Sequence, residues 1–345
     1  MLKYTLKRLV NAFVVLFIIA TTTWFLMQLL PGSPIQNAEK LTPEQEAQVE
    51  AQYNLDKPLP VQYGLYMVGL AQGDLGNSYL YGGKPVTDVI FERLPVSMFL
   101  GFQAVLFGLV AGLVLGVISG LKQNTIWDSA AAFIAVLGVS IPDLVLAPLL
   151  QYWLGLRLGI FPIAFFESWW HSVLPSLVLA TVISAVVATY MRTEMLEVLG
   201  QDYVTLAKAK GLSRLAVVLR HVLRNSLIPI VTILVPLTAA LVTGTLIVET
   251  VFSIPGIGEQ FVRSIFDSDY PVIMGTTLLF AVFFVASYLL QDVLYGLIDP
   301  RIRVVGDSVV AATGAGSAGQ GAPVGDLTGG DSSGEDSAGA RGGAN

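Results

Sequence analysis

The chain has 345 residues, of which 54% are hydrophobic and only 13% are charged. Because soluble domains carry roughly 25% charged residues, this is the composition of a membrane protein. The chain has no cysteine, which excludes disulfides and thiolate metal sites, and its two histidines, His171 and His221, lie 50 residues apart. We therefore expect no metal site in this chain and no nucleic-acid partner.

The first apolar segment covers residues 9–30 and follows Lys3, Lys7 and Arg8. It is long enough to cross about 30 Å of hydrocarbon. A signal peptide has a shorter apolar core, of about 7 to 15 residues, and ends in a small-residue cleavage site, which this segment lacks. Residues 1–30 therefore predict a cytoplasmic N-terminus followed by a retained transmembrane helix.

Residues 31–95 form a polar stretch after this first span. Thr42 and Gln45 have the spacing of a capping box, which predicts a short helix over residues 44–53. A second short helix is expected over residues 60–72. The stretch is too small to build a core of its own, so we expect a small extracellular cap.

The later part of the chain contains further apolar segments of membrane length. Glycines recur at every fourth residue of the first of them, which leaves a bare helix face for a close neighbour, more readily within this subunit than in another. These glycines are Gly108, Gly112, Gly116 and Gly120. The predicted spans cover residues 96–121, 129–154, 172–191, 227–248 and 272–298.

Two prolines in the third span, Pro142 and Pro148, each remove a helix donor, so this helix should be kinked or locally broken. Asp143 lies beside them, and an acid within a span is a functional candidate because burying its charge is costly. It is a possible pathway residue that attracts a cationic group such as a peptide amino terminus. Equally, it could lie in water near one end of the span or pair with a polar neighbour. Asp292, in the last span, is expected to have a structural partner.

The predicted fold class is an all-α integral membrane protein with six transmembrane helices, five of them in a core over residues 96–303. With the N-terminus inside, 13 of the 19 lysines and arginines lie inside and six outside. The positive-inside rule then predicts a multi-pass protein of the cell membrane with both termini cytoplasmic. Residues 304–345 are acidic and rich in glycine, alanine and serine, and are expected to be a disordered cytoplasmic tail.

The most charged connection between spans is the cytoplasmic segment 192–226, which carries six of the 19 basic residues. Asp202 is placed to cap a helix from Tyr203 to Lys210, and Gly211 stands where a left-handed residue would end it. Ser213 is placed to cap a second helix.

Both helices of this segment have an apolar face. In the first, Tyr203, Leu206 and Ala207 are expected to project as an apolar knob. In the second, the face expected to pack against the membrane helices contains Leu215, Val218, Leu219, Val222 and Leu223. The pattern fits a helix lying on anionic lipid as well as one inserted into a protein groove, and it leaves both interpretations open.

The segment DYVTLAKAKGL…RHVLRNSLIP resembles the EAA loop of ATP-binding-cassette importer permeases, in the branch that imports dipeptides, oligopeptides and nickel. The family pattern, Glu-Ala-Ala followed after three residues by Gly, falls on Thr205, Leu206, Ala207 and Gly211. Further stretches resemble the same branch over roughly residues 1–303. They are LLPGSP (29–34), GDLGNSY (73–79), PVTDVIFERLPVS (85–97), IVETVFSIPGIGEQF (247–261), DYPVIMG (269–275) and DVLYGLIDPRIR (292–303).

The resemblance implies a permease subunit of an ATP-driven importer, forming half of the pathway for di- or oligopeptides, with nickel or oligosaccharides as alternatives. It implies a second homologous permease, two cytoplasmic ATPase subunits that bind ATP and Mg, an extracellular solute-binding protein and membrane lipid as partners. The ATPase-coupling residues it implies are Asp202, Tyr203, Thr205, Leu206, Ala207, Lys208, Ala209, Lys210 and Gly211. The residues expected to support them are Ser213, His221, Arg224 and Asn225.

The chain itself has no G-x-x-x-x-G-K-[ST] phosphate loop, so we expect no catalytic residues and no cofactor on it. An alternative class is an ion-coupled secondary transporter, which Asp143, Asp292 and the proline-containing spans would suit. The sequence has no recognisable inverted repeat, which speaks against that class.

Overall fold

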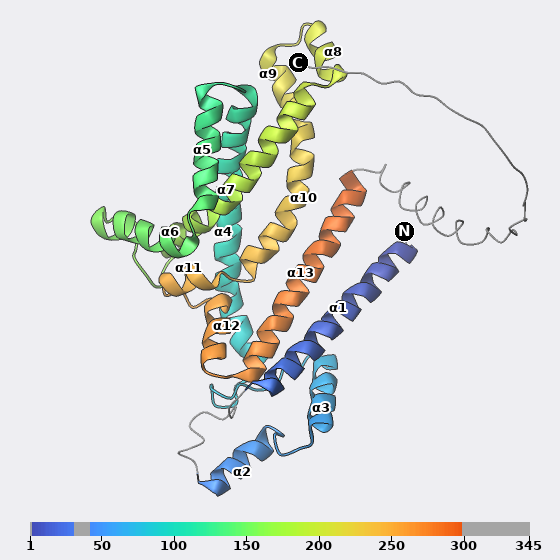
Figure 1. Ribbon diagram of the computed structural model, residues 1–345, viewed down its shortest axis with the longest axis vertical. Coiled ribbons are helices and arrows are strands. Elements are labelled where there is room, and N and C mark those ends of the chain that lie inside the picture. Colours follow the sequence, from blue (N-terminus) through green and yellow to red (C-terminus); the bar gives the residue numbers. More distant parts are fainter. Residues whose placement is uncertain (1, 31–41, 299–345) are drawn as a thin grey trace, which may run out of the picture. The chain divides into compact units, whose positions relative to one another are not determined.

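The computed structural model describes residues 2–30 and 42–298, and within them all regular secondary structure is helical apart from an isolated bridge between Asn77 and Pro85 (Figure 1). The expected tail at 304–345 lies outside the described residues. In chain order the helices are α1 (Leu2–Leu29), α2 (Pro43–Gln52), α3 (Leu59–Ala71), α4 (Val86–Leu121), α5 (Ile126–Ser140), α6 (Asp143–Leu150), η2 (Gln151–Arg157), α7 (Trp170–Leu199), α8 (Asp202–Ala209), α9 (Arg214–Val217), η3 (Val218–Val222), α10 (Leu223–Val242), α11 (Leu246–Val251), α12 (Ile257–Phe266) and α13 (Tyr270–Ile298).

Several of these helices have the length and composition of membrane spans. Five stretches of the described chain qualify on their own, and a sixth span is formed if α5 and the α6–η2 pair are counted together. The predicted all-helical membrane protein is therefore confirmed, with five or six candidate spans. The five are Leu6–Leu29, Val86–Leu121, Trp170–Leu199, Arg214–Val251 and Tyr270–Leu294.

The predicted kink in the third span is a break. Ile141 is extended, as a residue before proline prefers to be, and Pro142 has no amide hydrogen with which to continue α5. The chain restarts as α6 and continues into η2, and the two halves enclose an angle of 103°. The prediction that the helix over 129–154 is kinked or locally broken at its prolines is therefore confirmed.

The bare glycine face of α4 packs against α7. A Cβ atom on Gly108 would lie 2.5 Å from the Cβ of Ile183, and one on Gly112 would lie 2.7 Å from the carbonyl oxygen of Ser184. Gly116 approaches Met191 as closely. These contacts confirm that the glycine repeat serves packing within the subunit, and they show that α4 and α7 are in close contact.

Both ends of the membrane core can be placed by contacts. α13 begins beside the start of α4, where Gly275 approaches Val86, and it ends where Asp292 pairs with Arg8 of α1. Asp292 was expected to have a structural partner, and that partner is the guanidinium of Arg8. The start of α1 and the end of α13 thus point toward the end of the core where α8 and α9 lie, without reaching it (Figure 1).

A buried carboxylate organises the opposite end of the core. Glu249, on α11, is 1% exposed and accepts hydrogen bonds from the Oγ of Ser97 at 2.7 Å and the amides of Glu259 at 2.9 Å and Thr245 at 3.3 Å. Gly256 lies so close to this carboxylate that a Cβ atom would be 2.3 Å from its Cδ. The turn SIPGIG is thus folded around Glu249, a role that the sequence did not reveal.

A second buried acid attaches the loop before α4 to α13. Asp269 is fully buried and accepts hydrogen bonds from the Ser78 hydroxyl and from the amides of Tyr79 at 3.1 Å and Leu80 at 3.3 Å. Burial, together with the nearby Asp269 carboxylate, raises the pKa of the Tyr79 phenol well above its ordinary value. The stretches GDLGNSY and DYPVIMG, 190 residues apart, therefore meet in one structure.

The polar stretch between α1 and α4 contains the two predicted short helices. Thr42 and Gln45 form the predicted capping box at the start of α2, with the side chain of each accepting from the backbone amide of the other. α3 touches α1 through a hydrogen bond of 2.9 Å between the hydroxyls of Tyr63 and Thr21. This segment therefore packs on the membrane helices, as the prediction of a small cap requires.

Candidate functional site

The polar segment between α7 and α10 forms a helix–turn–helix at one end of the core (Figure 1). α7 ends at Leu199, and only Gly200 and Gln201 separate it from α8. After a short turn, α9 continues through η3 directly into α10. We call residues 201–225 the coupling loop. Its connection to two long helices means that a displacement of α8 acts directly on both.

The turn within the coupling loop depends on Gly211, as predicted. Gly211 has a φ of +80°, in the left-handed region that a residue with a Cβ rarely adopts. Its amide donates to the carbonyl of Lys208 at 3.0 Å, and the amide of Leu212 donates to the carbonyl of Ala207 at 3.4 Å. This paired arrangement is the Schellman motif that ends many helices.

Of the two predicted helix caps, one is confirmed and one is wrong. Ser213 caps α9, because its Oγ accepts from the amide of Ala216 at 3.3 Å. Asp202 lies inside the first turn of α8, and Gln201 occupies the extended capping position without a side-chain hydrogen bond. The carboxylate of Asp202 therefore acts on the helix only through its favourable position near the positive end of the dipole.

The two sides of α8 have different environments. Val204 is fully buried and Ala207 is 5% exposed, whereas Tyr203 and Leu206 are 42% and 55% exposed. The prediction that Ala207 projects with the knob is wrong, because its three-residue spacing from Val204 turns both toward the core. The remaining predicted residues of α8 and its end are exposed: Thr205, Lys208, Ala209 and Lys210.

The second helix packs by a face that matches the predicted one only in part. Of the predicted face, Val218 and Val222 are buried, whereas Leu215 and Leu219 are 68% and 53% exposed. Val217, which the predicted face did not include, is also buried. Val217 and Val222 belong to the same apolar cluster as Val204 of α8. The π-helical turn η3 adds a residue to this part of the helix and shifts its phase, which the regular 3.6-residue periodicity could not anticipate.

Asn225 joins the two helices of the coupling loop. Its Nδ2 donates to the hydroxyl of Tyr203 at 3.2 Å and to the carbonyl of His221 at 2.7 Å. His221 is half-buried, and Arg224 is exposed. The structure therefore brings Asn225 and Tyr203 together, as members of the predicted site. His221 contacts Asn225 through its backbone carbonyl and not through its ring.

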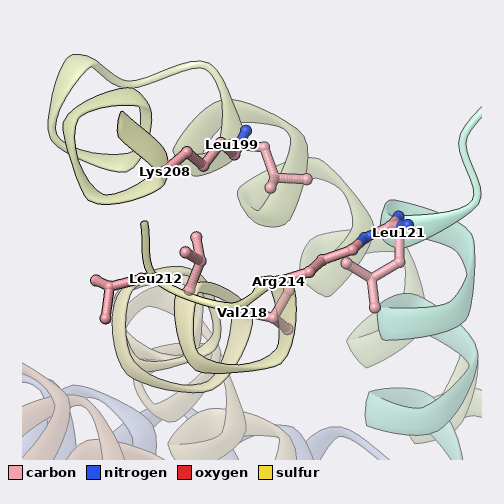
Figure 2. Close-up of a pocket in the computed structure, with 7 residues that line it drawn as sticks. Leu121, Leu199, Lys208, Leu212, Arg214 and Val218 are labelled. Carbon is pink, nitrogen blue, oxygen red and sulfur yellow. The ribbon is translucent and has the colours of Figure 1, made fainter. Parts of the chain in front are cut away.

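A cavity of about 410 Å³ separates α8 from the ends of the membrane helices. Figure 2 shows Lys208 reaching toward Leu199 and Arg214 reaching toward Leu121 across this space. Because of the cavity, α8 is attached through Val204, Ala207 and the Tyr203–Asn225 contact and not along its whole length. The cavity is lined by Leu121, Leu199, Lys208, Leu212, Arg214, Val217 and Val218.

Asp143 is remote from the coupling loop. It is half-buried in the first turn of α6, directly after the break, and makes no hydrogen bond or ion pair with other described residues. α6 packs near Leu174 at the start of α7, and the 25 residues from there to Leu199 correspond to roughly 38 Å of helix. The structure thus keeps the possible pathway acid and the coupling loop as separate sites.

The fold defines a multi-pass membrane protein with a helix–turn–helix between α7 and α10 at one end of its core. Residues 112–304 match the family of binding-protein-dependent transport system inner membrane components, and residues 1–101 match the N-terminal part of such components. The chain belongs to this family.

Its curated relatives include two dipeptide transport system permease proteins DppB. That of Lactococcus lactis subsp. cremoris is 44% identical over 304 residues, covering 88% of this chain and 100% of the relative. That of Bacillus subtilis is 41% identical, with 88% and 99% covered. The oligopeptide transport system permease protein OppB of Escherichia coli is 37% identical over 309 residues, with 88% and 100% covered.

Among solved structures, a chain of the MetNI methionine ABC transporter in an inward facing conformation has a TM-score of 0.51 at 17% identity. The match covers 62% of this chain and 97% of that one. At this level of identity the similarity is one of fold alone.

Proposed function

We propose that this chain forms half of the translocation pathway of an ATP-driven peptide importer, together with a second permease subunit. Curated relatives named as dipeptide and oligopeptide permeases support peptides as the substrate, since they match 88% of this chain. They favour peptides over the nickel and oligosaccharides that the sequence left open. Family membership argues against an ion-coupled secondary transporter.

The coupling loop is proposed to seat α8 in a groove on a cytoplasmic ATPase subunit. The observation that carries this proposal is the exposure of Tyr203 and Leu206 on a helix whose other face, Val204 and Ala207, is buried. A short helix anchored on one side and apolar on the other suits insertion into a protein groove. Two ATPase subunits would bind ATP and Mg, and this chain would itself hydrolyse nothing.

The orientation proposed follows from the charges. The coupling loop carries the basic residues Lys208, Lys210, Arg214, Arg220 and Arg224, and the positive-inside rule favours its end of the core as cytoplasmic. Both termini would then be cytoplasmic, and α2 and α3 would lie outside, where a solute-binding protein delivers the peptide.

Two substitutions test the docking of α8 in importers purified with their native partner subunits. Leu206→Glu places a charge on the exposed side of α8 without touching its buried face, so we expect loss of the ATPase subunits during purification. Ala209→Glu is the matched control, because Ala209 is an exposed residue of the same helix outside the apolar pair. If Leu206→Glu retains the ATPase subunits as well as the control does, α8 is not the docking element.

A third substitution tests transmission from the coupling loop to the membrane helices. Gly211→Val forces a β-branched residue to a φ of +80°, although no atom lies within 4 Å of the added Cβ. We expect the turn to distort, so that ATP hydrolysis continues while uptake of radiolabelled alanine di- and tripeptides into proteoliposomes falls. Uptake at the wild-type rate would refute the role of the turn.

A further inference from the structure

An ion pair on the coupling-loop side of the core joins helices that lie far apart in sequence. The guanidinium of Arg192, on α7, donates to Asp128, on α5, through Nε at 2.8 Å and Nη2 at 3.0 Å. This bidentate geometry fixes the relative orientation of the two side chains as well as their separation. Asp128 is 6% exposed, and the Arg192 side chain is 34% exposed.

The same carboxylate also holds the turn between α4 and α5. The hydroxyl of Ser119, near the end of α4, donates to Asp128, and the amide of Asn124 in the turn donates to it at 3.0 Å. Ser119 is 3% exposed. One carboxylate thus ties together the end of α4, the α4–α5 turn, the start of α5 and the last part of α7.

Stability alone does not explain this arrangement. A buried ion pair loses its hydration, and apolar residues of similar size often stabilise such a site equally well. The close packing of α5 on α7 is already supplied by small residues, with Ala135 of α5 against Ala185 and Ala188 of α7. The pair adds a fixed angular relation at the end of these helices.

That end is the one from which the coupling loop starts. From Arg192 the helix α7 continues without interruption to Leu199, and α8 begins at Asp202. A force on α8 therefore reaches Arg192 through about two turns of continuous helix. On its open side the ion pair borders a cavity of about 410 Å³ that Thr189 and Thr193 also line. The two side chains are therefore held in place by their mutual hydrogen bonds and not by dense packing around them.

We infer that Asp128 and Arg192 are positioning residues that make α5 move with α7 when the coupling loop is displaced. The inference rests on the proposed function of that loop. Without the pair, a displaced α8 would still move α7, but the α4–α5 turn and the helices α5 and α6 would not follow this movement. ATP would then be hydrolysed without the matching movement of α5.

The test measures ATP hydrolysed per peptide imported, in proteoliposomes that contain the complete importer, with radiolabelled alanine di- and tripeptides as substrate. Arg192→Gln and Asp128→Asn each remove charge-assisted hydrogen bonds, so we expect the ratio of hydrolysis to import to rise about ten-fold. Arg192→Lys keeps the charge without the two parallel hydrogen bonds, so its ratio of hydrolysis to import should lie between those of the wild type and Arg192→Gln. The matched control is Arg263→Gln, which breaks a surface pair with Asp267 on α12.

A second variant keeps the inference falsifiable if the single substitutions fail to assemble. Because the chain has no cysteine, Asp128→Cys with Arg192→Cys creates the only thiols in it. The double variant should be uncoupled as purified, and a short bifunctional thiol reagent that links the two positions should restore coupling.

An unchanged ratio in Arg192→Gln, or no recovery on cross-linking, would overturn the inference. The proposed function fails differently. If Gly211→Val also leaves the importer coupled and Leu206→Glu retains its ATPase subunits, the coupling loop itself is wrongly assigned. If Gly211→Val uncouples the importer and Leu206→Glu loses its ATPase subunits while Arg192→Gln leaves the ratio unchanged, only the role of the ion pair is refuted.

Discussion

Replacing Gly112 with alanine should destabilise the membrane core, although alanine is the better helix former. The added Cβ would lie 2.7 Å from both the carbonyl oxygen of Ser184 and the Cβ of Val187. Atoms of this kind ordinarily keep about 3.5–4.0 Å apart, so α4 and α7 would have to separate by about 1 Å. Neither contact atom is the end of a flexible side chain, so rotamer changes cannot relieve the clash.

The net effect follows from two opposing terms. Alanine in place of glycine stabilises a helix by roughly 0.5–1 kcal/mol, and overpacking a tight core costs about 1–3 kcal/mol. The packing cost dominates at Gly112. At Gly64, on the exposed face of α3, no atom lies within 4 Å of the added Cβ, so only the favourable term remains.

The assay is thermal unfolding of the purified importer in detergent, followed by the loss of monodisperse complex on heating. Gly112→Ala should lower the midpoint temperature, and Gly64→Ala should leave it unchanged or raise it slightly. Because the two Gly→Ala variants are expected to shift the midpoint temperature in opposite directions, a general effect of alanine on helix stability cannot explain the result. Equal midpoints for Gly112→Ala and wild type would refute the conclusion that the glycine face holds α4 against α7.

Two further predictions concern the end of the core opposite the coupling loop. Asp269→Asn would turn an amide donor toward the donors Ser78, Tyr79 or Leu80, at a cost of about 1–3 kcal/mol. The loop before α4 should then be cleaved by protease faster than in the surface variant Asp267→Asn. Equal cleavage of both variants would contradict this. Asp143→Asn should weaken import of alanine tripeptide more than import of its N-acetylated form, because only the free amino terminus is cationic, and an equal effect on both would exclude this role.

Local chemistry was readable from the sequence at several positions where one residue type satisfies a backbone requirement. Gly211 in the left-handed turn, Ser213 at a helix start and Thr42 with Gln45 in a capping box are all where the patterns predicted them. The glycine repeat likewise predicted its close neighbour. In each case the signal lies within a few residues and does not depend on the rest of the fold.

Features that depend on tertiary context were missed. Which side of the second coupling helix is buried depends on where α8 packs and on the π-helical turn η3, so Leu215 and Leu219 are exposed against expectation. Pro142 predicted an irregularity, but the 103° angle between the two helices could not be read from the sequence. Glu249 and Asp269 were each part of a recognised stretch, yet their hydrogen-bond partners lie up to 191 residues away in sequence.

The central claim is that α8 contacts an ATPase subunit and not the lipid surface. A photoreactive amino acid at position 206 tests it in the intact importer, because Leu206 is 55% exposed on α8. Position 126 at the start of α5, where the side chain is 77% exposed, serves as the control. We predict that illumination joins position 206, and not position 126, to the ATPase subunit. Cross-linking of position 206 to lipid alone would contradict the account.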